Sequence, residues 1–176
     1  MPSRHLIPIE KFTIKPFHLL DVQSLLLTSG DLPKNHFNAM TIGWGSFGYI
    51  WRRPFVQVVV RPVRYTFEFM EKYDTFTLCA FPPQYHEALQ LLGSKSGRDL
   101  DKIAAAGLTP LVSTKIPAPG FEEASLILEC RKIYWADLNF DRFLDPGIEL
   151  NYPQKDYHRS YFGEILAIFG VESFEA

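Results

Sequence analysis

Two arginines and a threonine near the middle of the chain have the residue types and spacing of a phosphate site. The segment reads Arg61-Pro-Val-Arg64-Tyr-Thr66 and joins a valine-rich run to a predicted helix. Guanidinium groups hold phosphate through charge-assisted hydrogen bonds, and the free N–H groups of a helix N-terminus add donors. The segment therefore predicts a site for a phosphate monoester. The alternative is that both arginines are solvated surface charges and that Thr66 only caps the helix.

A second segment has the features of a surface for a flat ligand. It reads Asn38-Ala-Met-Thr-Ile-Gly-Trp44, a strand pattern with an asparagine at its mouth and with glycines at Gly43 and Gly45. Glycine weakens a strand interior, so its presence there indicates that a ligand or another backbone approaches closely. A planar ring could lie against this stretch. The alternative is a tight bend of the barrel, packed by Trp44.

A third segment, Gly93-Ser-Lys-Ser-Gly-Arg-Asp99, places hydroxyls, two cations and flexible backbone in one loop. Its spacing is not that of the nucleotide-binding loop G-x-x-x-x-G-K-[ST], and no strand leads directly into it. A phosphate or a partner subunit's ligand could be held here. An exposed linker between two helices explains the same residues.

His158 is the one candidate for a catalytic residue. It lies in Asp156-Tyr-His158-Arg-Ser-Tyr161, before the predicted last strand, where a histidine beside tyrosines can move protons or shape a pocket near neutral pH. A single histidine is weak evidence, so the catalytic residues are left open. The other histidines lack metal-ligand spacing, and Cys79 and Cys130 lie outside any C-x-x-C pattern, so no metal site is predicted.

These segments need a scaffold of short strands. Proline and glycine punctuate the chain, and the apolar runs between them are short, which is typical of a barrel or a sandwich. The β-branched run Val58-Val59-Val60 predicts a central strand that is covered on both faces. The predicted strands are 24–29, 39–45, 56–61, 76–81, 125–136 and 164–171.

Three helices are predicted around these strands. The first covers 66–73, where a threonine precedes a mixed apolar and charged pattern. The second begins near Pro83, carries apolar residues at 88, 89, 91 and 92, and ends at Gly93 as its C-cap. The third covers 100–106 and ends at Gly107. No repeat or linker divides the chain, so residues 1–176 are predicted to form one domain.

Composition limits the partners of the chain. A formal net charge of −2 over 176 residues provides no basic field for nucleic acid. The N-terminus has no continuous apolar signal segment, and no run approaches the roughly 20 apolar residues of a membrane span, so a cytoplasmic location is predicted. Aromatic residues make up 15% of the chain. This excess favours an aromatic-lined pocket, a subunit interface, or both.

Taken together, the order and spacing of these segments resemble the flavin-reductase-like, FMN-binding split-barrel family, with flavoredoxin-like members most similar. The similarity covers most of the chain and includes Tyr157-His158 besides the three segments above. It implies a mainly β fold, an antiparallel Greek-key split β-barrel with a few short peripheral helices. It also implies FMN as the cofactor and a homodimer that holds each flavin near the subunit interface.

The same resemblance implies roles for individual residues. The flavin ring would lie along the strand that holds the asparagine, and the phosphate would meet the arginine segment. The implied ring contacts are Asn38, Met40, Thr41 and Trp44, the implied phosphate contacts are Arg61, Arg64, Tyr65 and Thr66, and Ser94, Lys95 and Ser96 would close the site. The resemblance leaves three alternatives for His158, which are contact with the nicotinamide, contact with the flavin, or neither.

The implied function is electron transfer from NADH or NADPH through FMN to free flavin, a ferric complex or a protein. No G-x-G-x-x-G segment is present, so a nicotinamide would have to stack on the flavin instead of occupying a Rossmann site. One alternative is an FMN-holding electron carrier without NAD(P)H turnover of its own. Another is a β-barrel that binds some other phosphate ester. The sequence does not identify the electron acceptor.

Overall fold

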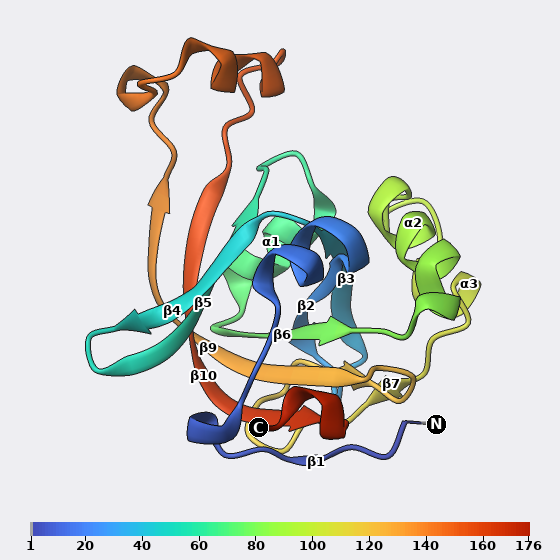
Figure 1. Cartoon of the computed structure of the whole chain (residues 1–176). Coiled ribbons are helices and arrows are strands. Elements are labelled where there is room, and N and C mark those ends of the chain that lie inside the picture. The colour runs from blue at the N-terminus through green and yellow to red at the C-terminus, as the bar shows by residue number, and fades with distance from the viewer. Residues whose placement is uncertain (1) are drawn as a thin grey trace.

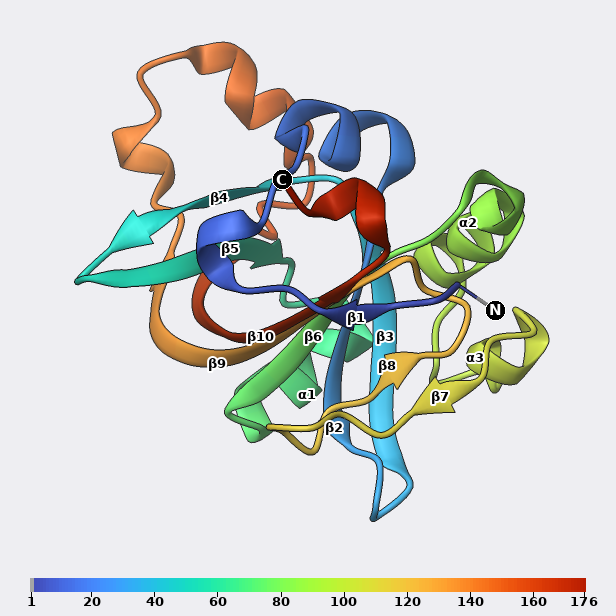
Figure 2. The ribbon, with the colours of Figure 1, turned by 60° about the horizontal axis from the view of Figure 1, so that its bottom comes forward.

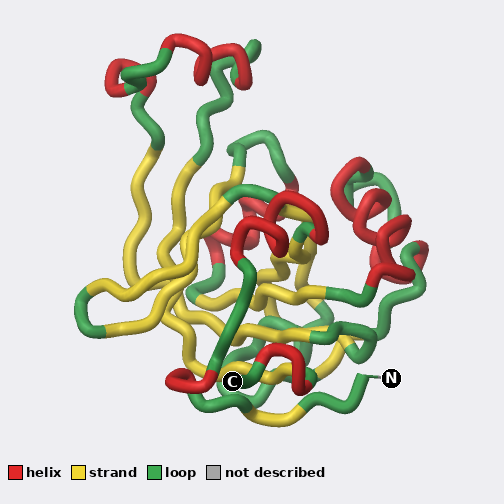
Figure 3. Tube along the Cα trace, viewed as in Figure 1, coloured by secondary structure: helices red, strands yellow, loops and turns green. Residues whose placement is uncertain are grey.

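The computed structural model describes residues 2–176, and strands dominate it (Figures 1 and 3). The strands are β1 His5–Leu6, β2 Leu25–Asp31, β3 His36–Ile42, β4 Gly45–Ile50, β5 Arg53–Val60, β6 Thr75–Ala80, β7 Pro110–Leu111, β8 Gly120–Phe121, β9 Leu126–Asp137 and β10 Arg159–Gly170. The main sheet runs β3-β2-β6-β9-β10-β5-β4, with β1 paired to β10, while β7 and β8 form a separate pair. All of these pairs are antiparallel, which confirms the predicted mainly β, antiparallel fold.

Every predicted strand is present, but several boundaries differ from the prediction, and two of these differences bear on the site. The predicted strand 39–45 is two elements, because β3 ends at Ile42 and a separate strand, β4, begins at Gly45. The sequence does not reveal β4, since Gly45 and Gly48 interrupt its apolar pattern. β10 begins at Arg159, earlier than predicted, so His158 directly precedes the strand and Tyr161 lies inside it.

The three predicted helices are α1 Tyr65–Lys72, α2 His86–Ser94 and α3 Lys102–Ala105. Two details of the prediction are wrong. Gly93 lies inside α2, whose C-cap is Lys95, and Thr66 is the second residue of α1, whose N-cap is Arg64. Figures 1 and 2 show α2 and α3 on one side of the sheet, away from the β4–β5 hairpin. No helix within residues 2–176 is long and apolar enough to cross a membrane.

The sheet curls around one apolar core, and its outer surface carries a second. Side chains such as Leu25, Leu27, Phe76, Leu128 and Tyr161 fill the first, whereas Leu26, Phe81, Leu89, Leu92 and Ile103 pack α2 and α3 against the outside of the sheet. Alternation along β5 buries Val58 and Val60 completely, but Val59 stays partly exposed. The predicted coverage of both faces is therefore wrong at Val59.

The barrel is split at one seam. β3 and β4 follow each other in the chain through only Gly43 and Trp44, yet they stand at opposite ends of the strand order. Within residues 2–176, the strand partner of β3 is β2 alone and that of β4 is β5 alone. Edge strands leave a row of backbone N–H and C=O groups without ladder partners. The seam therefore offers hydrogen-bonding backbone next to the link.

The connection between β9 and β10 projects from the barrel as an arm, residues 138–157 (Figure 1, orange). It contains the 3₁₀ helices Phe140–Arg142 and Pro146–Asn151. Aromatic rings hold the arm to itself, with centroids 5.6 Å apart for Phe140 and Tyr157 and 6.1 Å apart for Phe143 and Tyr152. The arm returns to the barrel at His158, beside the seam.

Candidate functional site

A cavity of about 190 Å³ opens at the seam, and we call it the split cavity. β3, the link to β4, the end of β5 and the residue before β10 all contribute to its wall. The lining residues are Met40, Thr41, Ile42, Gly43, Trp44, Val59, Arg61 and His158. The fold thus brings three of the four predicted ring contacts together with the histidine candidate.

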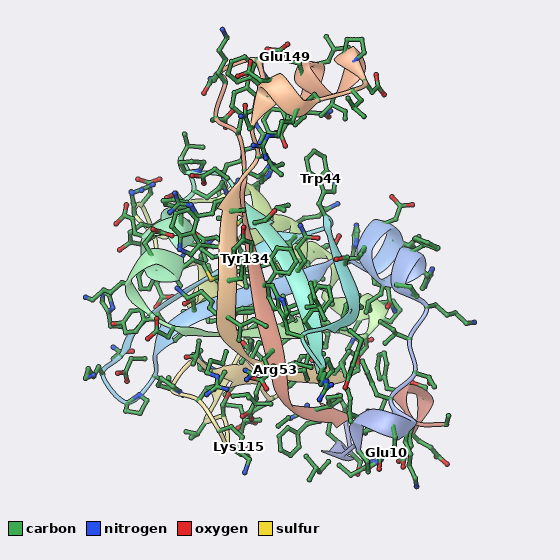
Figure 4. The ribbon with its side chains drawn as sticks, turned by 90° about the vertical axis from the view of Figure 1, so that its left-hand side faces the viewer. Glu10, Trp44, Arg53, Lys115, Tyr134 and Glu149 are labelled. Atoms are coloured by element: carbon green, nitrogen blue, oxygen red, sulfur yellow. The ribbon has the colours of Figure 1, made fainter. Side chains whose placement is uncertain are left out.

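Trp44 and His158 form the aromatic part of this cavity. Their ring centroids are 5.3 Å apart. Trp44 keeps 50% of its surface exposed, and Figure 4 shows it projecting from the barrel toward the arm that carries Glu149. An indole that is half exposed beside apolar side chains offers a face on which another planar ring can stack. The split cavity is therefore suited to a flat aromatic ligand.

His158 is a neutral group in this environment. Only 8% of the residue is exposed, and its Nδ1 lies 2.8 Å from the Tyr152 hydroxyl. Burial, together with the positive charge of Arg61, lowers the pKa of His158 to about 4, although Asp156 opposes the shift. At neutral pH the imidazole can accept or donate a hydrogen bond in the cavity, but it holds no extra proton to give.

We expect stability of the protein to fall with acid because of His158. Its folded-state pKa of about 4 lies below the ordinary value near 6.5, so the unfolded chain binds more protons as pH falls through this window. The free energy of unfolding should drop by about 2 kcal/mol between pH 7 and pH 5 from this group alone. Urea titrations of the wild type and of His158→Gln measure it. Equal pH dependence in both proteins would contradict the buried neutral histidine.

Arg61 is engaged by the arm. Its Nη1 donates to both carboxylate oxygens of Asp156 at 3.1 Å, and its Nη2 donates to the carbonyl of Asn151 at 2.8 Å. The guanidinium also lies 5.0 Å from the centroid of Tyr152. Because Asp156 already pairs with it, Arg61 is not a free surface charge. The contact of Arg61 with the same phosphate as Arg64 stays a prediction.

A second cavity, of about 160 Å³, gathers cations and hydroxyls, and we call it the basic cavity. Its lining residues are Val63, Arg64, Tyr65, Thr66, Ser94, Lys95, Ser96, Arg98 and Lys102. Four of these carry positive charge and none carries negative charge. Arg98 lies 4.7 Å from the Tyr65 ring and forms an ion pair with Glu68 outside the cavity. Such a lining fits a dianion better than any other group.

Thr66 contributes a buried hydroxyl to the basic cavity. The residue is 1% exposed, and its Oγ1 accepts a 2.8 Å hydrogen bond from Nδ2 of Asn38. Within residues 2–176 the hydroxyl proton itself meets no acceptor, so it is available to a ligand oxygen. Asn38 lies away from the split cavity. It positions Thr66, and a side chain at Gly97 would overlap its Oδ1. The contact of Asn38 with the flavin ring stays a prediction.

The loop that follows α2 both links α2 to α3 and closes the basic cavity. Ser94 Oγ donates to Gln90 O at 2.8 Å, and Ser96 Oγ accepts from the backbone N–H of Arg98 at 3.2 Å. Lys95 is exposed and lines the same cavity. The linker and the phosphate interpretations of this segment are therefore compatible.

The two cavities lie on either side of one turn. The N–H of Arg64 donates to Arg61 O at 3.0 Å, so this turn carries Arg61 into the split cavity and Arg64 into the basic cavity. Thr41 joins them on the other side, because its hydroxyl donates to Leu89 O at 2.6 Å and it packs against Gly93. The Thr41 hydroxyl is therefore occupied by α2, and only the other atoms of the Thr41 side chain can contact a ring in the split cavity.

Six lining residues are absent from the predicted site residues: Ile42, Gly43, Val59, Val63, Arg98 and Lys102. Strand alternation places Val59 on the face of the split cavity only once the position of the seam is known. Arg98 lies in a predicted loop, where no neighbouring residue in the sequence marks it as part of a site. Lys102 gives no signal at all, because a lysine in a predicted surface helix reads as solvated, whereas the structure buries it at 3% exposure. Arg98 and Lys102 become part of the site through the packing of α2 and α3, and Val59 through the approach of β3 and β5 at the split cavity.

Comparison with solved structures gives the same fold at low sequence identity. The FMN-binding domain of a flavin reductase-like enzyme from Shewanella baltica OS155 superposes with a TM-score of 0.69 at 18% identity, covering 96% of this chain and 78% of that one. Flavoredoxin of Desulfovibrio vulgaris (Miyazaki F) gives 0.65 at 22%, covering 85% and 70%. The 2-nitrobenzoate 2-nitroreductase of Pseudomonas fluorescens gives 0.63 at 17%, covering 94% and 70%. No curated protein sequence matches significantly.

A family model extends the comparison from fold to sequence. The model described as "Flavin reductase like domain" matches residues 22–167. This range contains both cavities, the seam and the arm, and it agrees with the resemblance inferred from the spacing of the motifs. The chain belongs to the flavin reductase-like domain family.

Proposed function

We propose that the chain binds FMN across the two cavities and works as an oxidoreductase of the flavin reductase type. The observation that carries the proposal is the adjacency of a flat aromatic cavity and a basic cavity across the turn from Arg61 to Arg64. FMN has the matching shape, a planar ring joined by a flexible chain to a phosphate monoester. The ring would lie against Trp44 and β3, and the phosphate would lie among Arg64, Thr66 and Lys95.

When bound, FMN supplies the redox chemistry, since its ring accepts a hydride and passes electrons on. The residues of this chain bind, orient and tune it. Trp44 and Val59 keep water from one face of the ring, and the free edge of β3 offers backbone hydrogen bonds to its polar rim. Arg61, which Asp156 holds in place, forms part of the wall of the split cavity.

The proposed electron donor is NADH or NADPH, and the acceptor is free flavin, a ferric complex or a protein. The half-exposed Trp44 supports this assignment, because the split cavity is open where a nicotinamide would need to stack. The second candidate is an electron carrier without NAD(P)H turnover, which the similarity to a flavoredoxin favours. Both candidates use the same flavin site.

Anaerobic mixing separates the candidates. The purified protein should be yellow, and NADH or NADPH should bleach its flavin absorbance within seconds if the chain is a reductase. Slow bleaching with NAD(P)H but rapid bleaching with dithionite would identify a carrier. A colourless protein that takes up no added FMN would overturn the proposal and leave the binding of another phosphate ester.

We also propose that the chain works as a homodimer. Four rings form a continuous aromatic face on β5, β9, β10 and the turn between β4 and β5: Trp51 with Tyr134 at 5.8 Å, Tyr134 with Phe162 at 5.5 Å, and Phe162 with Phe55 at 5.5 Å between centroids. Trp51 is 58% exposed and Tyr134 is 49% exposed, and Figure 4 views the face with Tyr134 labelled. Contiguous exposed aromatic surface is typical of interfaces, whereas single exposed rings are not.

Light scattering is expected to give twice the chain mass of 20.3 kDa. Changing Trp51 and Tyr134 together to glutamate should produce a monomer, because charge at the centre of an apolar interface is not compensated. Val112→Glu is the control, since Val112 is even more exposed, at 69%, but lies outside the aromatic face. A wild type that stays at 20.3 kDa with flavin bound contradicts the dimer.

A further inference from the structure

Lys102 is a buried amine at the wall of the basic cavity. Only 3% of the residue is exposed, and its Nζ donates to Leu92 O at 2.9 Å and to Lys95 O at 3.1 Å. It belongs to α3, yet both acceptors lie at the end of α2 and in the residue that caps it. A lysine is rarely buried without a charged partner. Its position therefore needs a reason beyond packing.

The end of α2 supplies that reason. The last carbonyls of a helix lack intrahelical partners and carry the negative end of the helix dipole. Here they meet the basic cavity, where a bound anion would be repelled by them. Arg64 donates through Nη2 to Gly93 O at 2.5 Å, and Lys102 covers Leu92 O and Lys95 O. Two cations thus neutralise a helix end that points at a predicted phosphate.

We infer that Lys102 is a positioning residue for the phosphate of the flavin: it fixes the loop after α2 and neutralises the carbonyl end of α2, so that a dianion can bind beside it. The inference rests on the proposed FMN site and goes beyond it. Lys102 acts through the positions of Ser94, Lys95 and Ser96 and through its charge. It does not need to touch the phosphate.

This role couples flavin binding to protonation of Lys102. Burial, reinforced by the charge of Arg64, lowers the pKa of Lys102 to about 8. The other titratable and charged groups around it are Arg64, Tyr65, Lys95 and Arg98 in the basic cavity, and His36 and Asp101 in the neighbouring cavity of about 340 Å³. Asp101 is occupied in capping α3. A phosphate dianion would therefore raise the pKa of Lys102, and binding would take up a proton above pH 8.

The test compares FMN with riboflavin by fluorescence quenching between pH 7 and pH 9. The FMN phosphate is a dianion throughout this range, since its second pKa lies near 6. The dissociation constant of FMN should rise about three- to tenfold across the range, and that of riboflavin should stay constant. Lys102→Arg should bind FMN with a flat pH profile, because a guanidinium keeps its charge. Lys102→Met should lose at least about tenfold in FMN affinity at pH 7.5 and much less for riboflavin.

Each result decides the inference. A flat FMN profile in the wild type overturns it, and so does an equal loss of both flavins in Lys102→Met, which would indicate a purely structural lysine. If circular dichroism shows that Lys102→Arg does not fold, the wild-type profile decides alone. A wild type that binds neither flavin overturns the proposed FMN site itself, whereas normal FMN binding with a flat profile overturns the role of Lys102 alone.

Discussion

Replacing Arg64 with alanine is expected to weaken FMN binding by roughly 30- to 1,000-fold, using about 1.4 kcal/mol per factor of ten. Two effects add. The variant loses a charge-assisted contact to the phosphate, and it leaves Gly93 O, at the negative end of α2, without its donor. Fluorescence quenching measures the dissociation constant. The wild-type preference for FMN over riboflavin should largely disappear in this variant.

Arg61→Ala is the matched control for Arg64→Ala. Both positions border the same turn, but Arg61 lines the split cavity and is neutralised by Asp156. Its loss should therefore affect FMN and riboflavin alike, through the ring and the base of the arm. If Arg61→Ala removes the preference for FMN while Arg64→Ala keeps it, the assignment of the two cavities is reversed.

Gly45→Ala is expected to destabilise the fold by about 3 kcal/mol, the upper end of the usual cost of overpacking, because the neighbour is rigid backbone. A methyl group at Gly45 would overlap the carbonyl oxygen of Gln57 on β5, a backbone atom that the paired strands hold in place. Thermal unfolding should shift down by roughly 6 to 12 °C, at 2–4 °C per kcal/mol. Differential scanning calorimetry measures this shift.

Gly43→Ala is the control for Gly45→Ala, because it makes the same change at the other glycine of the seam. A Cβ at Gly43 would lie 3.1 Å from Leu20 O, a distance that a small movement of the neighbouring segment relieves. The melting temperature should fall by no more than about 4 °C. Equal losses in the two variants would show that Gly45 has no special role. The sequence indicates that a ligand or another backbone approaches these glycines closely. At Gly45 the approaching group is the backbone of β5, and the proposed ligand lies against β3 instead.

The sequence by itself determines the local elements and the order of the motifs. Short apolar runs between glycines and prolines predict the strands, and charged-apolar spacing predicts α1 and α2, because both patterns reflect burial along one element. Spacing also brings Arg64, Tyr65 and Thr66 to the start of one helix, so part of the basic cavity is visible without a structure. β4 is not predicted, because glycines stand at positions where side chains would otherwise show the alternation of a strand.

Tertiary structure alone decides which motifs share a cavity. Arg61 and Arg64 look alike in sequence, but a single turn sends them to different cavities, and Asp156, far along the chain, neutralises only Arg61. Lys102 joins the site because α3 packs against the end of α2, and His158 because the arm returns at the seam. Burial, partner charges and helix ends depend on contacts between distant segments. Those contacts set the charge of His158 and Lys102, and no local pattern records them.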